Sequence, residues 1–208
     1  MAKLLDWDEK YSFNNDACLS KTFRICIIGS SGVGKTNLIL DLLIKRCPIH
    51  KTFFLDYNVL VICSPSISQM KYQAMIKGFN KGLNKDQLYQ LYQERENIKN
   101  LDKALEEMKN DLPIRPIFKV ITFNNTEQLI MPEVLRKNYP NEKILLLIDD
   151  SMNSDLTIVE KYFSYSRALG INVIFISQGY TKIKKTSMRE QVNIFILFKQ
   201  SLSNIKTV

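Results

Sequence analysis

Residues 29–36 read Gly-Ser-Ser-Gly-Val-Gly-Lys-Thr, which fits the pattern G-x-x-x-x-G-K-[ST] of a phosphate-binding loop. Glycines let successive backbone N–H groups curl around phosphate oxygens without Cβ clashes. The Lys35 ammonium can reach the β- and γ-phosphates, and the Thr36 hydroxyl can ligate Mg²⁺. We therefore expect ATP and Mg²⁺ to bind here. The expected nucleotide contacts are Gly29, Ser30, Ser31, Gly32, Val33, Gly34, Lys35, Thr36 and Asn37.

Two adjacent carboxylates, Asp149 and Asp150, follow the apolar run ILLLI at residues 144–148. Ligands of open α/β sheets gather at the C-terminal ends of strands. Asp149 is therefore expected to hold Mg²⁺ through its water shell. The Asp150 side chain points elsewhere, so it can orient or deprotonate the attacking water. The alternative is that Asp150 or Ser151 caps a helix.

A glutamine, Gln178, follows the next apolar run, INVIFIS at residues 171–177. A glutamine at this edge of a sheet can contact the γ-phosphate or the lytic water and report hydrolysis to the loop that follows. The alternative is an ordinary surface glutamine.

Short apolar runs that alternate with amphipathic ones must position these side chains. Near-continuous Val, Ile and Leu in the runs predicts an α/β fold, with a mainly parallel sheet that helices cover on both faces. The expected strands are residues 23–29, 58–65, 119–123, 143–150, 171–178 and 193–198. The expected helices are residues 35–46, 127–137 and 155–169.

Residues 66–112 interrupt this alternation after the second expected strand. They contain polar, helix-like sequence without sustained heptads, so we expect a solvated helical insertion, or alternatively a subunit or partner contact. The expected organisation is an N-terminal extension at residues 1–22 and one P-loop ATPase domain at residues 23–208.

The chain has 208 residues and a formal net charge of +8. This charge favours a polyanionic partner, either nucleic acid or a membrane surface, although a solubility bias would give the same balance. Four cysteines without CxxC spacing and a single histidine argue against a zinc site and favour a reducing, intracellular setting. The acidic N-terminus does not fit a signal peptide, and the apolar runs are too short for membrane insertion, so we expect a soluble protein.

Together, the phosphate loop, the insertion, LLLIDDSM and INVIFISQ resemble the viral DNA-packaging ATPases of the FtsK–HerA superfamily. The best fit is the poxvirus-type branch, shared with other large DNA viruses, virophages and Polinton-like elements. The similarity spans residues 23–199, and the combination of Asp149-Asp150 with Gln178 is more specific than the phosphate loop. The resemblance implies a RecA-like core in a homo-oligomeric ring, a pentamer or hexamer, that packages double-stranded DNA into a preformed capsid.

Further partners and roles are implied by the same resemblance. The ring would dock on capsid portal or vertex proteins, in the host cytoplasm (the virus factory), in the virion, or in both. Lys35 and Thr36 become nucleotide and Mg²⁺ contacts, and Asp149 becomes the Mg²⁺-associated acid. Asp150 becomes the catalytic carboxylate, and Gln178 becomes the sensor.

Basic residues near the sensor strand complete the implied site. Arg167 lies where the family tends to place an arginine finger that acts on ATP in the neighbouring subunit, and Arg189 is a weaker candidate. The alternative for Arg167 is a helix-end arginine that faces the dipole. Lys182, Lys184 and Lys185 are candidate contacts to DNA phosphates, or alternatively a solvated basic loop.

Other functions are weighed against the translocase. A small nucleoside or nucleotide kinase also has a phosphate loop, but it normally carries an arginine-rich lid, whereas the segment after Ser177 has lysines and one arginine. A GTP-binding switch would need N-K-x-D and D-x-x-G motifs, which the sequence lacks. A nucleotide-binding protein without turnover is the remaining alternative. Because the chain ends within ten residues of the last expected strand, we expect no nuclease domain.

Overall fold

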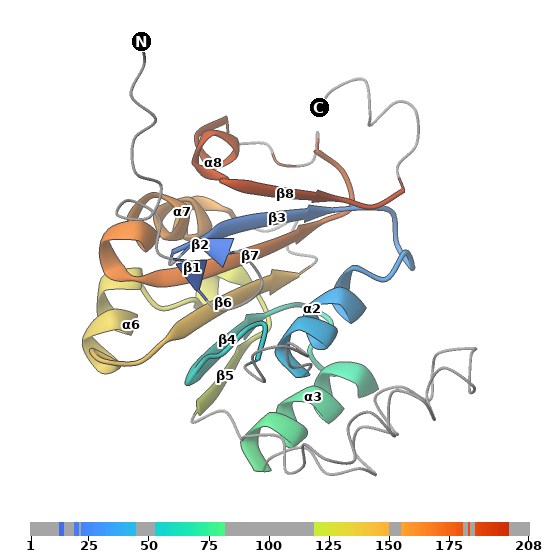
Figure 1. Ribbon diagram of the computed structural model, residues 1–208, viewed down its shortest axis with the longest axis horizontal. Helices are drawn as coiled ribbons and strands as arrows, with labels where there is room; N and C mark the ends of the chain where they lie inside the picture. Colours follow the sequence, from blue (N-terminus) through green and yellow to red (C-terminus); the bar gives the residue numbers. More distant parts are fainter. Residues whose placement is uncertain are drawn as a thin grey trace.

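A computed structural model of the chain describes residues 13–14, 19–20, 22–44, 53–81, 119–149, 155–180, 183 and 186–199. Its centre is a six-stranded sheet in the order β5-β4-β6-β7-β3-β8 (Figure 1). All neighbouring strands of this sheet run parallel, which confirms the predicted α/β architecture. The strands are β3 (Arg24–Ile28), β4 (Val59–Cys63), β5 (Lys119–Phe123), β6 (Ile144–Asp149), β7 (Ile171–Ser177) and β8 (Ile194–Leu197).

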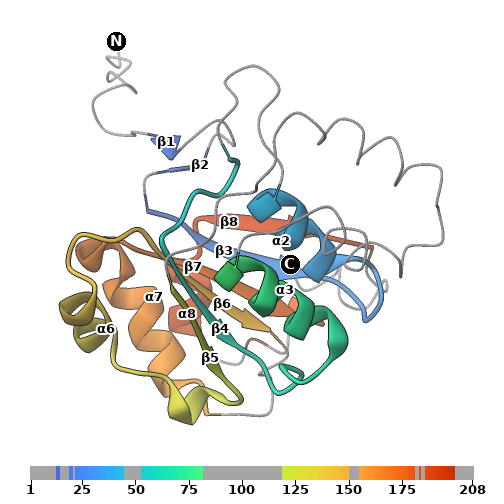
Figure 2. The same ribbon diagram turned by 90° about the horizontal axis from the view of Figure 1, so that it is seen from below.

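Helices cover both faces of the sheet (Figure 2). Because side chains alternate along a strand, Ile25 and Ile27 pack in the layer with α2 (Lys35–Ile44) and α3 (Met70–Lys81). Cys26 and Ile28 pack in the opposite layer. That layer is formed by α6 (Pro132–Asn138), α7 (Thr157–Leu169) and α8 (Thr186–Gln191). Burial on both faces explains why the inner strands β3, β4, β6 and β7 read as continuous apolar runs.

The strand order brings the candidate residues to one edge of the sheet. Strand β7 lies between β3, which leads into the phosphate loop, and β6, which carries Asp149. In this register Ile28 pairs with Ser177, and Asp149 pairs with Ile176. The C-terminal ends of these strands therefore lie side by side, as the sequence predicts.

The observed elements differ from the predictions at several points, among them the start of α7 at Thr157 and not at residue 155. The predicted helix at 127–137 is wrong at its start, because a single 3₁₀ turn, η1 (Thr126–Gln128), comes first and α6 begins only at Pro132. Proline fits the first helical position, where its missing N–H costs nothing. Helix α8 and the antiparallel pair β1 (Phe13–Asn14) and β2 (Leu19–Ser20) are not predicted. Residues 45–46 of the first predicted helix are outside the described residues.

Helix α3 begins the segment that the sequence marks as an insertion. Its side chains Tyr72, Met75 and Phe79 are buried in the core, so α3 is not the solvated helix that was expected. Residues 82–118 lie outside the described part of the chain. No helix in the described part has the length and apolar character to cross a bilayer.

Candidate active site

The phosphate-binding loop joins β3 to α2, which confirms its predicted context between a strand and a helix. Gly32 and Gly34 adopt φ angles of +77° and +97°, the left-handed region that favours glycine. A Cβ on Gly29 would lie 2.7 Å from Phe198 Cβ and 2.8 Å from Val33 Cγ2. The loop therefore needs its glycines for two different reasons, backbone conformation and close packing.

Lys35 begins α2, and its side chain is only 8% exposed. Its ammonium donates hydrogen bonds to the carbonyl oxygens of Gly29, at 2.6 Å, and Ser30, at 2.7 Å. These bonds hold the charge against the phosphate-binding loop, where it can meet a phosphate anion.

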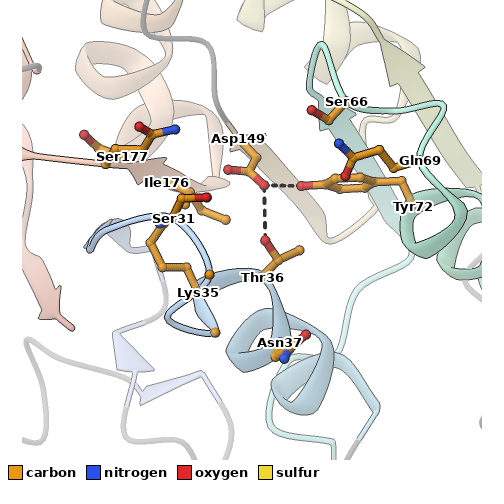
Figure 3. Close-up of a pocket in the computed structure, with 13 residues that line it drawn as sticks. Ser31, Lys35, Thr36, Asn37, Ser66, Gln69, Tyr72, Asp149, Ile176 and Ser177 are labelled. Atoms are coloured by element: carbon orange, nitrogen blue, oxygen red, sulfur yellow. Dashed lines mark hydrogen bonds between the residues drawn. The ribbon is translucent and has the colours of Figure 1, made fainter. Parts of the chain in front are cut away.

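Thr36 and Asp149 connect the loop with the end of β6 across the interposed strand. The Thr36 hydroxyl donates to Asp149 Oδ2 at 3.2 Å (Figure 3). A hydroxyl and a carboxylate are hard oxygen donors that suit Mg²⁺, which is usually held by few side chains together with substrate phosphates. Within the described part of the chain, no cluster of three or more His, Cys, Asp or Glu side chains is arranged to hold a metal ion. The Thr36–Asp149 pair suits a Mg²⁺ ion that nucleotide phosphates also coordinate.

Tyr72, from α3, is a site residue that the sequence analysis missed. Its side chain is 3% exposed, and its hydroxyl donates to the same Oδ2 atom of Asp149. Burial raises the Tyr72 pKa, and the negative charge of Asp149 raises it further. The phenol therefore stays protonated and acts as a hydrogen-bond donor. A tyrosine in a polar helix carries no sequence signal that could have identified it.

The end of β7 forms another wall of the same pocket. The Ser177 carbonyl accepts a hydrogen bond from the Gly29 N–H at 3.1 Å, and the Ser177 hydroxyl donates to the Gly179 carbonyl at 2.7 Å. Gln178 follows, half-buried, among the residues that line the pocket. The lining residues are Ser31, Gly32, Gly34, Lys35, Thr36, Asn37, Ser66, Gln69, Tyr72, Asp149, Ile176, Ser177 and Gln178.

The structure does not bring every predicted site residue to this pocket. Arg167 is exposed in the last turn of α7, just before β7 begins, so it lies at the N-terminal edge of the sheet. Burial lowers the pKa of Arg24, at the same edge, and the positive charge of Arg167 lowers it further. Arg167 is therefore remote from the pocket of its own subunit. Asp150, Lys182, Lys184 and Lys185 lie outside the described residues.

Arg189 is tied to the segment that follows Gln178. Its Nε donates to the Ile183 carbonyl at 2.7 Å, and its guanidinium lies 5.1 Å from the centre of the Tyr180 ring. These two contacts connect Arg189 to Tyr180 and Ile183, which follow the predicted sensor Gln178 in sequence.

Three features together define a P-loop NTPase: the phosphate loop, the contact between Thr36 and Asp149, and strand β7 between the two strands that carry them. Two structures of the genome-packaging NTPase B204 from Sulfolobus turreted icosahedral virus 2 resemble the chain. The complex with AMPPCP gives a TM-score of 0.50 at 13% identity, covering 90% of this chain and 80% of that one. The complex with AMP gives a TM-score of 0.50 at 12% identity, covering 90% of this chain and 81% of that one. The likeness concerns the fold, and the predicted RecA-like class is confirmed.

The family is identified by sequence. The family model described as Poxvirus A32 protein matches residues 10–118, just over half of the chain, and the chain belongs to this family. No curated protein gives a significant match. The predicted resemblance to the poxvirus-type packaging ATPases is confirmed, and the protein is an ATPase of the viral genome-packaging type.

Proposed function

We propose that the protein hydrolyses Mg²⁺-bound ATP in this pocket and uses the reaction to move double-stranded DNA into a preformed capsid. The observation that carries the proposal is the 3.2 Å contact between Thr36 and Asp149, because it joins the phosphate loop to an acid two strands away. A phosphate loop alone binds nucleotide, whereas hydrolysis also needs groups around the terminal phosphate.

Each side chain in the pocket has a proposed task. The loop N–H groups and the Lys35 ammonium bind the phosphates, while Thr36 and Asp149 hold Mg²⁺. When bound, Mg²⁺ neutralises charge that develops on the phosphate oxygens. Gln178 lies at the pocket, which supports its role as the sensor of the terminal phosphate. Asp150 remains the proposed base that accepts the proton of the attacking water.

The position of Arg167 supports a ring. It is exposed and lies at the opposite edge of the sheet from the pocket of its own subunit, so any part it takes in hydrolysis must be at the ATP of a neighbouring subunit. We therefore retain a homo-oligomeric ring, a pentamer or hexamer, with Arg167 as the finger between subunits. An arginine at that point neutralises charge on the transferred phosphoryl group.

DNA is the proposed polyanionic partner. The net charge of +8 favours it, and Lys182, Lys184 and Lys185 follow the sensor closely in sequence. We place the motor at a capsid portal or vertex, in the host cytoplasm or in the virion. A small kinase is not favoured, because the family assignment points to genome packaging.

The test is steady-state ATP hydrolysis with and without duplex DNA, over a range of salt concentrations. We expect DNA of any sequence to stimulate turnover, and we expect stimulation to weaken as salt rises. A Lys35→Ala variant provides the inactive control. A protein that hydrolyses ATP only when a small phosphate acceptor is supplied would overturn the proposal, and so would one that never hydrolyses ATP.

A further inference from the structure

Tyr72 joins helix α3 to the acid of the candidate magnesium site. We propose that Tyr72 is a positioning residue, whose phenol O–H holds the Asp149 carboxylate in the orientation that receives Mg²⁺-nucleotide. This inference rests on the proposed function. It gives helix α3, which lies outside the phosphate-loop motif, a role in binding Mg²⁺-nucleotide.

Two hydroxyl groups converge on one carboxylate oxygen. Thr36 approaches Asp149 Oδ2 from α2 and Tyr72 approaches it from α3, as Figure 3 shows. The terminal torsion of an aspartate is broad, so its staggered rotamers alone do not fix the plane of the carboxylate. Donors from two different elements do fix it, because each restricts where Oδ2 can lie.

The phenol is held firmly enough for this task. Tyr72 packs in the same core layer as Met75 and Phe79 of its own helix, with Leu147 of β6 as a member of that layer. The start of α3 is also tied down, because the Gln73 side-chain amide donates to the Ile67 carbonyl at 2.9 Å. The tyrosine ring is therefore placed by the core, and its hydroxyl transmits that placement to Asp149.

Groups that orient a metal ligand without touching the metal contribute measurably to metal affinity. Removing such a partner typically lowers affinity about 10- to 100-fold. The Tyr72 hydroxyl contacts Asp149 and also interacts with the Thr36 and Ser64 side chains, and Asp149 and Thr36 are the two groups assigned to Mg²⁺. Its loss should therefore weaken binding of Mg²⁺ and leave Mg²⁺-independent binding of the nucleotide unchanged.

The test compares Tyr72→Phe with a matched control, Tyr162→Phe. Tyr162 is also fully buried, and its hydroxyl donates to the Ile130 carbonyl at 2.6 Å, but it lies in the opposite core layer. Both changes remove one buried hydroxyl and keep the ring. A fluorescent ATP analogue reports nucleotide affinity in EDTA, and Mg²⁺ titration of the complex reports metal affinity. Thermal melts show whether the two variants lose similar stability.

We expect Tyr72→Phe to weaken Mg²⁺ binding about 10- to 100-fold, with unchanged nucleotide affinity in EDTA and no effect of Tyr162→Phe on either quantity. Unchanged Mg²⁺ affinity in Tyr72→Phe would overturn the inference and leave the proposed function standing. An equal loss in EDTA would also overturn it, since that result indicates a general disturbance of the pocket. Failure of the wild-type protein to bind Mg²⁺-nucleotide would instead count against the proposed function itself.

Discussion

The two edges of the central sheet use polar side chains in different ways. At the C-terminal edge, side chains from α2, α3, β6 and β7 converge on an open pocket. At the N-terminal edge, the Arg136 guanidinium is directed at main-chain carbonyl groups around the ends of α6 and α7, and burial lowers its pKa. It donates to the carbonyl oxygens of Leu169, Tyr139, Pro140, Glu142 and Gly170.

Two asparagine side chains at the N-terminal edge also form hydrogen bonds with main-chain groups, as Arg136 does. The Asn172 side-chain oxygen accepts the Phe23 N–H at 2.6 Å, and the Asn193 side-chain oxygen accepts the Arg24 N–H at 2.7 Å. Polar groups that are satisfied by their own main chain stabilise the fold, whereas polar groups gathered around a shared space can bind a ligand. Substitutions at the two edges should therefore separate activity from stability.

The largest expected effect is at the C-terminal edge. Asp149→Asn keeps the size of the side chain but removes the charge that we propose to hold Mg²⁺, so kcat should fall on the order of 1000-fold, or about 4 kcal/mol. The melting temperature should change little. Both are measured by ATP turnover and thermal unfolding of the same preparation. Near-normal turnover would remove Asp149 from the magnesium site and weaken the contrast between the edges.

An intermediate effect is expected for Arg136→Ala at the N-terminal edge. Loss of charged hydrogen bonds to several carbonyl groups should lower the free energy of unfolding by about 3 kcal/mol. Turnover per folded molecule should stay normal, because Arg136 is remote from the pocket. Lys143→Ala is the control, since its exposed ion pair with Asp56 at 2.8 Å should contribute less than about 1 kcal/mol. Equal losses in denaturant titrations of the two variants would contradict this assignment.

The smallest change in the free energy of unfolding is expected for the two asparagines, Asn172 and Asn193. Asn172 is 4% exposed, so Asn172→Ala leaves the Phe23 N–H buried without its acceptor and should cost about 2 kcal/mol. Asn193 is exposed, so water can replace its side chain and Asn193→Ala should cost under about 0.5 kcal/mol. Chemical denaturation of both variants gives the comparison. A reversed order would show that burial does not control the stability of this edge.

The sequence predicts the sheet well because its four inner strands, β3, β4, β6 and β7, are buried on both faces. In a chain that also contains a phosphate loop, the run ILLLID predicts a buried strand. Strand β6 spans these same residues. Helix α8 is too short to carry a clear helical periodicity, and the start of α6 is marked by Pro132 and not by its apolar pattern. These errors concern boundaries and short elements and leave the architecture unchanged.

The candidate site was predictable only in part. The phosphate loop is recognised from spacing, and Asp149 and Gln178 are recognised because parallel strands end at a common edge. Tyr72 could not be found in this way, because its role depends on how α3 packs across the sheet. Arg167 shows a different limit. It is exposed at the N-terminal edge of the sheet, and a role as an arginine finger would become visible only in a structure that includes the neighbouring subunit.

Phe198, the residue after β8, connects the end of β8 to the end of β3. Its N–H donates to the Ile28 carbonyl at 2.8 Å, and its Cβ occupies the space that a side chain at Gly29 would need. An alanine at position 29 would therefore clash with Phe198 and Val33 together. Keeping this loop geometry would require a glycine in place of Phe198, and a smaller residue or another side-chain placement at Val33.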